Sequence, residues 1–250
     1  MGERTTTTEQ AKSGTIRAVV DEIVKSKSFR NNQIMRFGYN ADDDVAKQMY
    51  AHLARSLFEP NFKITASNKN IYEFIIAYAL GRSDLDKYNV CTNSDNCKAI
   101  GIIGNTGSGK SLAMQIFREF CKVDDIKYAI GGKIKRFTPV MISARRIVNE
   151  FNSKGYDALD VITNWDSMII DDLGAENQNA KYYGSEVQVM EYVIEERYNK
   201  NLLTHFTTNL DMRQIEDEYG ERVRSRLFKS TNLIKMVSSD FRMEGVEYEY

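Results

Sequence analysis

The chain has 250 residues, a length that allows one or two domains. Hydrophobic residues make up 42% of the chain and charged residues 28%, proportions that are typical of a soluble protein with a substantial core. The formal net charge of −1 excludes a polycation, so any nucleic-acid binding has to come from a local basic patch.

Cysteine and histidine are scarce in this chain. The three cysteines, Cys91, Cys97 and Cys121, lack the spacing of a metal site, and their odd number indicates free thiols in a reducing compartment. Only His52 and His205 are available as histidine ligands, which argues against a zinc site. We find neither a signal peptide nor an apolar run as long as a membrane span, so we expect a cytoplasmic protein with no membrane partner.

The first 66 residues contain no catalytic motif. Residues 1–10 are polar and rich in threonine, which predicts disorder. Residues 11–28 carry apolar side chains at helical spacing, and a second helix follows that is capped by Asn40 or Asp42. We expect one apolar face on this second helix, made of Val45, Met49, Leu53 and Leu57. We interpret residues 1–66 as a small helical N-terminal module that either packs on the core or binds a partner.

A nucleotide-binding domain is predicted over residues 67–250. Its first element is a helix over residues 68–80, which ends at a possible glycine cap, Gly81. The apolar stripe of this helix comprises Ile71, Phe74, Ile75 and Tyr78. A polar loop then leads to the most informative stretch of the chain.

That stretch is the glycine-rich turn at residues 104–111, which lies between an apolar run and a helical pattern that continues to Phe120. It matches the P-loop pattern G-x-x-x-x-G-K-[ST], whose glycines let backbone N–H groups approach a phosphate closely. In this pattern Lys110 neutralises the β- and γ-phosphates of ATP, and Ser111 holds Mg²⁺. The expected ATP-binding residues are Gly104, Asn105, Thr106, Gly107, Ser108, Gly109, Lys110 and Ser111.

After the P-loop helix, residues 126–136 predict a β-hairpin with a Gly-Gly turn. A buried strand over 138–143 and a helix from Ala144 follow, and helical spacing continues weakly to Ile162. Basic side chains gather in this stretch. They predict a path for a single-stranded nucleic acid, with an ordinary solvated surface as the equal alternative. These residues are Lys133, Lys135, Arg136, Arg145 and Arg146.

The second strong motif is the pair Asp171 and Asp172, at the end of an apolar strand predicted over residues 165–174. A Mg²⁺–nucleotide site needs a carboxylate at the C-terminal end of a strand that neighbours the P-loop strand. We therefore expect Asp171 to help bind Mg²⁺ through an ordered water. Asp172 is expected to polarise the water that attacks ATP.

A helix over residues 186–199 and a strand over residues 201–210 come next. The strand ends in the polar residues Thr207, Thr208 and Asn209. A polar side chain at this position can reach between the two aspartates and the γ-phosphate of ATP, and Asn209 is the residue that we expect to do so.

Three arginines lie on a short helical segment predicted over residues 219–228. Arg222 and Arg226 are four residues apart and share a face, whereas Arg224 does not. A solvated basic helix would explain the same pattern. A final strand is predicted over residues 232–238.

These motifs together resemble AAA+ ATPases of the DnaC/IstB group, which are helicase loaders and transposition helpers. The resemblance covers about two-thirds of the chain and rests on five segments, which are residues 104–111, 171–176, 196–198, 207–209 and 220–226. It implies an α/β P-loop NTPase fold, with a parallel five-stranded sheet in the order 5-1-4-3-2 flanked by helices, and no C-terminal helical lid.

The resemblance also implies a mechanism. Arg226 would act as an arginine finger on the ATP of a neighbouring subunit, and Arg222 would support that interface. The implied partners are other copies of the chain in an ATP-dependent homo-oligomer, a replicative helicase, and DNA, most simply single-stranded. Asp172 stands where many AAA+ proteins have glutamate, and its shorter reach predicts slow hydrolysis.

Other functions are compatible with parts of the pattern. An IstB-like transposition regulator would have the same motifs and would form filaments on duplex DNA. A small-molecule P-loop kinase would need an acceptor site and a lid, and it gives no role to the strand over residues 201–210. A binding module without hydrolysis would require a degenerate site, but no key residue is missing.

Overall fold

The computed structural model describes residues 35–36, 42–91, 93–122, 126–130, 133–177, 180–182 and 185–237. The predicted disorder of residues 1–10, the predicted helix over residues 11–28 and the expected absence of a lid after the last strand concern residues outside these ranges. Among the described residues, no helix combines the length and the apolar character needed to cross a lipid bilayer.

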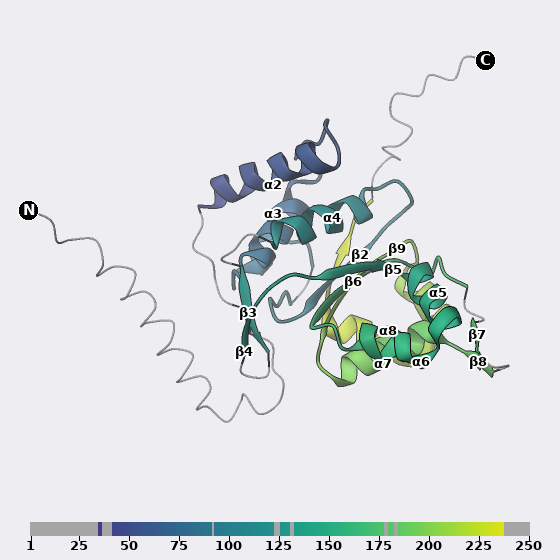
Figure 1. Ribbon diagram of the computed structural model, residues 1–250. Helices are drawn as coiled ribbons and strands as arrows, with labels where there is room; N and C mark the ends of the chain where they lie inside the picture. The colour runs from purple at the N-terminus through teal and green to yellow at the C-terminus, as the bar shows by residue number, and fades with distance from the viewer. Residues whose placement is uncertain are drawn as a thin grey trace, which may run out of the picture.

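A parallel five-stranded sheet forms the centre of the molecule (Figure 1). Its strand order is β10-β2-β9-β6-β5. The strands are β2 (Ala99–Ile103), β5 (Val140–Ser143), β6 (Ser167–Leu173), β9 (Leu203–Thr208) and β10 (Thr231–Lys235). Numbered along the chain, these strands have the order 5-1-4-3-2, so the predicted topology is confirmed. Because the strands are parallel, their C-terminal ends meet at one edge, where a ligand site is expected.

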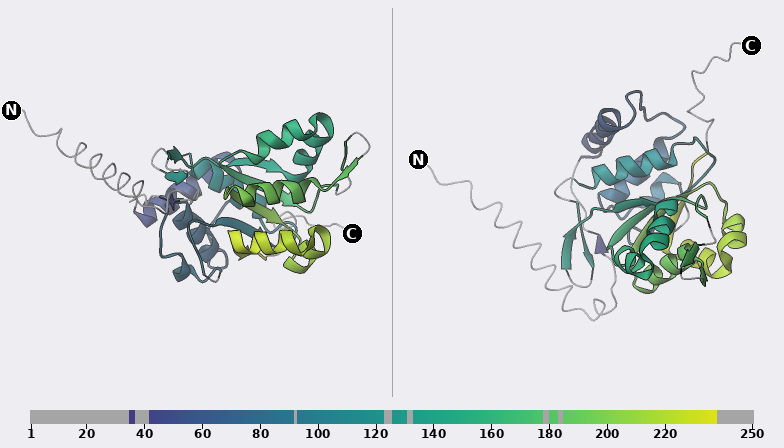
Figure 2. Two further views of the ribbon diagram at one scale, coloured as in Figure 1. Left: turned by 90° about the horizontal axis from the view of Figure 1, so that it is seen from below. Right: turned by 45° about the vertical axis from the view of Figure 1, so that its right-hand side comes forward.

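Helices cover both faces of this sheet (Figures 1 and 2). One face carries α3 (Lys69–Ala79) and α4 (Lys110–Phe120), with α2 (Asp43–Leu57) outside them, and the short helix η2 (Leu85–Tyr88) follows α3. The other face carries α5 (Ala144–Lys154), α6 (Tyr156–Thr163), α7 (Val189–Asn199) and α8 (Met212–Ser230). Ile169 and Ile170, successive residues of β6, belong to the two different cores, as expected of a sheet that is buried on both faces.

The helix predicted over residues 68–80 is confirmed as α3. Its residues Phe74, Ile75 and Tyr78 are buried against the sheet. The last helical residue is Ala79, and two residues later Gly81 has a φ of 71° and donates its N–H to the Tyr78 carbonyl at 3.0 Å. The glycine therefore ends the helix in the left-handed conformation that its sequence position suggested.

The apolar face predicted for α2 is wrong, although the cap is right. The Asp42 carboxylate accepts hydrogen bonds from the backbone N–H groups of Asp44 and Val45. The buried residues of α2 are Ala46, Tyr50 and Ala54, whereas Val45, Met49 and Leu57 are 55%, 40% and 55% exposed. Leu53, the fourth residue of the predicted face, is partly buried against the core. Two small alanines allow α2 to lie close to its neighbours, and the Tyr50 hydroxyl donates to the Ala113 carbonyl of α4 at 3.1 Å. The positions of large apolar side chains in the sequence therefore do not identify the buried face of α2.

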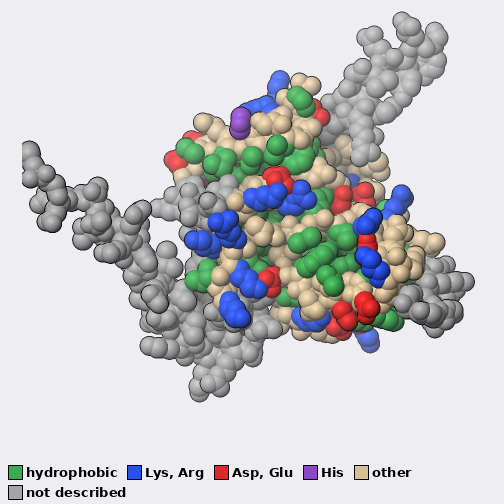
Figure 3. Space-filling model, in the orientation of Figure 1, with side chains coloured by type: hydrophobic (Ala, Val, Ile, Leu, Met, Phe, Trp, Pro, Cys, Tyr) green, Lys and Arg blue, Asp and Glu red, His purple; other side chains and the backbone are tan. Residues whose placement is uncertain are grey.

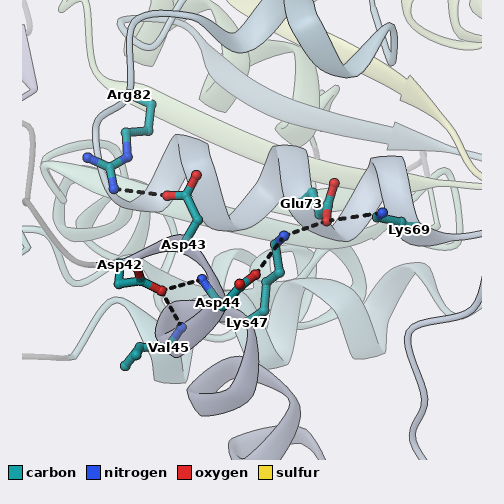
Figure 4. A network of polar contacts seen from close by, with 8 residues as sticks. All are labelled: Asp42, Asp43, Asp44, Val45, Lys47, Lys69, Glu73 and Arg82. Carbon is teal, nitrogen blue, oxygen red and sulfur yellow. Dashed lines mark hydrogen bonds and ion pairs between the residues drawn. The ribbon is translucent and has the colours of Figure 1, made fainter.

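Ion pairs hold the N-terminal half of α2 to the segment around α3 (Figure 4). Arg82 contacts Asp43 at 3.0 Å, and Lys47 contacts Glu73 at 2.8 Å. These pairs are partly solvent-exposed, so each contributes about 1 kcal/mol or less. The helix α2 thus packs on the nucleotide-binding domain, while the division of the chain at residue 66 stays a prediction.

The predicted hairpin is confirmed as β3 (Lys127–Ile130) and β4 (Lys133–Arg136), which pair antiparallel. The short strand β1 (Met35–Arg36) pairs with the other side of β3. All four residues of β4 are exposed. Figure 3 shows Lys and Arg side chains gathered over the end of the molecule that this hairpin forms.

Four boundaries or burial predictions need correction. β5 is the edge strand of the sheet, and Val140 is 40% exposed, so the strand is not fully buried. The helical pattern from Ala144 to Ile162 is two helices, because Gly155 has a φ of 64° between them. α7 begins at Val189, since Ser185–Val187 forms β8, paired with β7 (Ala180–Tyr182). The arginine segment is the second half of α8, which begins at Met212 with a capping box formed by Asp211 and Gln214.

Candidate nucleotide site

The P-loop connects the end of β2 to the start of α4 at the C-terminal edge of the sheet. Gly107 and Gly109 have φ values of 78° and 89°, in the left-handed region that glycine tolerates best. Gly104 is required for another reason. A Cβ at this position would lie 1.7 Å from the Met236 carbonyl oxygen, so any side chain would collide with the backbone that follows β10.

The first turn of α4 adds N–H groups that have no partner inside the helix. α4 begins at Lys110, directly after the glycine turn. Such a helix N-terminus favours an anion, because its amide dipoles present partial positive charge. The loop residues Asn105 and Thr106 are exposed, so a ligand can reach the loop from solvent.

The Lys110 ammonium joins two loop carbonyls to the end of β9. Its Nζ donates to the carbonyls of Gly104 at 2.9 Å and Asn105 at 2.7 Å, and to Oδ1 of Asn209 at 2.8 Å. The side chain is 5% exposed. The structure therefore brings Lys110 and Asn209, two residues selected from sequence, into direct contact. A phosphate that entered the loop would compete with these oxygens for the ammonium protons.

A β-bulge shapes the aspartate pair. Ile170 of β6 lies opposite Phe206 of β9, and the next paired position joins Leu173 to Thr208. Two residues of β6, Asp171 and Asp172, therefore face the single residue Thr207. The aspartates lie near the C-terminal end of β6, which β9 separates from the P-loop strand β2, so the expectation that their strand neighbours the P-loop strand is wrong.

The Thr207 hydroxyl holds both aspartates of the bulge. It donates to Oδ1 of Asp171 at 2.7 Å and accepts from the Asp172 backbone N–H at 2.9 Å. Thr207 is fully buried, and Asp172 has a φ of 54°. A non-glycine residue in the left-handed region is uncommon and is often found at functional sites. The neighbouring Thr208 hydroxyl donates to the Leu173 carbonyl at 2.7 Å and fixes the end of the bulge.

The donor set at this edge fits Mg²⁺. Ser111 supplies a hydroxyl from the first turn of α4, and Asp171 supplies a carboxylate whose orientation Thr207 fixes. Mg²⁺ commonly takes one or two protein oxygens and completes its shell with waters and phosphate oxygens. In the part of the chain that the structure describes, no cluster of three or more His, Cys, Asp or Glu side chains forms a metal cage. The residues thus suit a magnesium ion that arrives with a nucleotide.

The two selected arginines meet a common partner on α7. Arg226 forms an ion pair with the Glu195 carboxylate, and Arg222 lies 3.7 Å from the same oxygen. The Arg226 guanidinium also lies 5.5 Å from the centroid of the Tyr198 ring. The shared partner confirms that Arg222 and Arg226 lie on one face, and Arg224 pairs elsewhere, with Glu216 at 2.8 Å. These ion pairs lead to α7 and not to the P-loop of the same chain.

Arg197 is a structural residue of the segment 196–198. It is fully buried and donates to the hydroxyl of Thr204 and to the carbonyls of Ile162, Trp165 and Leu203, at 2.6 to 3.2 Å. Burial lowers the pKa of Arg197 to about 10. The side chain joins α7, the end of α6 and the start of β9, so it belongs to the scaffold beneath the site.

Three contacts near the candidate site are not predictable from local spacing. The Thr207 hydroxyl links the two aspartates, whereas the sequence shows Thr207 only as part of a polar strand end. Glu176 is the last residue of the segment 171–176, and its partner Tyr219 is 43 residues away. The sequence gives no indication that Glu195 pairs with Arg222 and Arg226, since an isolated glutamate on a helix is usually solvated.

Comparisons with known proteins identify the fold. No family model matches the chain, and no curated protein matches its sequence. Among solved structures, the DnaC helicase loader has a TM-score of 0.51 and 16% identity, with 76% of this chain and 99% of that chain covered. The structure of DnaI gives a TM-score of 0.44 with 18% identity, covering 82% and 87% of the two chains. A protein described as a primosome component from Streptococcus pyogenes gives 0.48 with 17% identity, covering 68% and 80%.

Proposed function

We propose that this chain is a Mg²⁺-dependent ATPase that assembles into a homo-oligomer and loads or remodels a replicative helicase on DNA. It has the AAA+ P-loop fold seen in the DnaC helicase loader. The observation that carries the proposal is the contact of Lys110 with both the P-loop carbonyls and Asn209, beside an aspartate pair that a buried threonine holds.

Each site residue has a role in the proposed reaction. The loop 104–111 and Lys110 bind the phosphates, while Ser111 and Asp171 hold Mg²⁺, which neutralises phosphate charge when bound. Asp172 accepts the proton of the attacking water, and Asn209 orients the γ-phosphate. Arg226 of a neighbouring subunit stabilises the charge that develops on that phosphate, and Arg222 supports the contact.

The proposed partners follow from the fold and the surface. The resemblance to a helicase loader suggests a replicative helicase as the protein partner. The exposed basic side chains of β4 suit the backbone of single-stranded DNA, because phosphate contacts dominate nonspecific affinity. Of these side chains, Lys135 pairs with Asp166, which lowers the net charge that the hairpin offers.

The decisive experiment is ATP binding by Lys110→Ala. Removing the ammonium takes away a charge-assisted contact and is expected to weaken ATP·Mg²⁺ by at least about 1.5–3 kcal/mol. Isothermal titration calorimetry measures the change, with Lys154→Ala, which is 64% exposed on α5, as the matched control. Equal affinity in wild type and Lys110→Ala would show that the loop is not a phosphate site.

A further inference from the structure

We propose that Glu176 and Tyr219 couple the hydrolysis centre to the arginine helix, by which we mean residues 221–230 of α8. Both are positioning residues that act through their neighbours. The inference rests on the proposed ATPase function and adds a pathway between two of its parts. Through this coupling, the position of Arg226 would depend on the conformation of the β6 bulge that contains Asp171 and Asp172.

The pathway begins directly after the aspartates. The backbone N–H of Gly174 donates to Oε2 of Glu176 at 2.9 Å, which folds the segment after β6 back on itself. The other carboxylate oxygen, Oε1, accepts a short hydrogen bond from the Tyr219 hydroxyl. Glu176 is 8% exposed and Tyr219 is 3% exposed. Both oxygens of this buried carboxylate accept a hydrogen bond, which favours one orientation of the side chain.

The pathway continues through a hinge in α8. Gly220, the residue after Tyr219, has a φ of 86° and a ψ of 162°, so the helix is interrupted there. Only glycine adopts such a conformation readily. A Cβ at Gly220 would meet no atom within 4 Å, so the conformation and not the available space requires glycine. The interruption lets the two halves of α8 change direction relative to each other.

The pathway ends at Arg226, the proposed arginine finger. Val223 and Leu227 bury one side of the arginine helix in the core, and Arg226 pairs with Glu195 on α7. The direction of this helix is therefore set at two places, by Tyr219 at its start and by Glu195 along its length. A shift of the aspartate bulge when ATP is bound or hydrolysed would move Gly174 and Glu176, and Tyr219 would transmit that shift to the hinge.

A conservative variant tests the coupling without emptying the core. Tyr219→Phe removes only the hydroxyl that Glu176 accepts from. The matched control is Tyr50→Phe, which also loses one buried hydroxyl, bonded to the Ala113 carbonyl on the opposite face of the sheet. Thermal unfolding establishes that both variants fold. Gly220→Ala provides a second variant, which strains the hinge backbone without a steric clash.

Two measurements on the full chain separate coupling from a merely structural role. The first is the steady-state division into kcat and KM for ATP. The second is amide hydrogen exchange of residues 221–230 with and without a non-hydrolysable ATP analogue and Mg²⁺. We expect Tyr219→Phe to bind ATP within about twofold of wild type while kcat falls about tenfold or more. We also expect the analogue to change exchange in residues 221–230 of wild type and of Tyr50→Phe, and to change it in neither Tyr219→Phe nor Gly220→Ala.

The outcomes distinguish this inference from the proposed function. If wild type binds no ATP, the proposed function is wrong and the coupling falls with it. If wild type binds ATP, and Tyr219→Phe keeps both its kcat and its exchange response, the coupling is wrong and the ATPase function stands. If wild type binds ATP without hydrolysing it, kcat cannot be compared. Amide hydrogen exchange of residues 221–230 then tests the coupling by itself.

Discussion

At the scale of single residues, the hydroxyl of Thr207 organises the chemistry that two aspartates are proposed to carry out. The contact of Asp172 with this hydroxyl runs through its backbone N–H, whereas Asp171 uses a carboxylate oxygen. A change of the Asp172 side chain therefore leaves the backbone link of the bulge in place. This separation allows hydrolysis to be tested with the hydrogen bond between the Asp172 backbone and Thr207 intact.

Asp172→Asn is expected to keep ATP affinity within about tenfold while turnover falls about 10²-fold or more, because an amide cannot accept the proton of the attacking water. Calorimetry gives the affinity and phosphate release gives the turnover. Asp42→Asn serves as the matched control, since asparagine caps α2 as well as aspartate does. Equal turnover in Asp172→Asn and wild type would remove Asp172 from the proposed role.

At the scale of elements, Arg197 of α7 joins the start of β9, which follows α7 directly, to the end of α6, about 35 residues earlier in the chain. Its guanidinium satisfies carbonyls at the end of α6 and at the start of β9, with no exposed atom. Charge inside the core is tolerated here because several hydrogen bonds replace the lost water.

Arg197→Met is expected to lower the free energy of unfolding by about 3–5 kcal/mol, since it leaves several buried acceptors without donors. Arg197→Lys keeps the positive charge but loses the planar fork of donors, so it should also destabilise the protein. Urea denaturation measures both variants. Arg55→Met, on the exposed face of α2, should change stability by about 0.5 kcal/mol or less.

The β3–β4 hairpin supports a second prediction at this scale. Replacing five basic residues by alanine should weaken binding of a fluorescent single-stranded oligonucleotide and reduce the dependence of that binding on salt concentration, because fewer counterions are released. These residues are Lys133, Lys135, Arg136, Arg145 and Arg146. Within this set, Arg146 pairs with Glu150 at 2.5 Å and Arg145 donates to the Ala175 carbonyl. Lys135 is likewise paired, with Asp166, so pairing does not distinguish the hairpin residues from the two arginines of α5.

A control for the hairpin variant replaces Arg55, Lys63 and Lys69, exposed residues near α2 and α3. This triple variant removes the same kind of charge away from the hairpin. If the five-residue variant binds with unchanged affinity and an unchanged salt slope, β4 is an ordinary solvated surface.

At the scale of the whole molecule, the proposed function requires several copies of the chain to assemble. Lys110 supplies the cation of the chain's own P-loop, while the ion pairs of Arg222 and Arg226 lead to Glu195 on α7. Under the proposed function, Arg226 acts on the ATP of an adjacent copy. A trans-acting arginine contributes about 10³–10⁵-fold to turnover in comparable NTPases.

Mixing two inactive variants tests this arrangement. Arg226→Ala should bind ATP normally yet fail to hydrolyse it, and Asp172→Asn should be inactive for a different reason. In a mixed oligomer, an intact Asp172 site meets an intact Arg226 from its neighbour, so ATPase activity should reappear. Turnover of wild type should also rise more than linearly with protein concentration. A mixture that co-assembles and stays inactive, or a dilute monomer at full rate, contradicts action in trans.

Much of this protein is determined by short stretches of its sequence. The P-loop, the Asp42 cap, the α3 stripe and the hairpin all depend on residues within one or two turns of one another, so local spacing predicts them. The order of strands in the sheet followed from the resemblance that those motifs carry. The two arginines share a face because their separation of four residues matches the helical repeat.

Only the tertiary structure decided the features that join distant segments. The Thr207 hydroxyl bonds a backbone N–H 35 residues away, and Tyr50 of α2 bonds a carbonyl 63 residues away. The bulge arises because β6 has two residues, and β9 only one, between consecutive paired positions. The alanines of α2 are buried because a neighbouring helix lies close to them. Such contacts depend on which surfaces meet after folding. Local periodicity does not specify which surfaces come into contact. Packing and hydrogen bonding between elements determine those contacts.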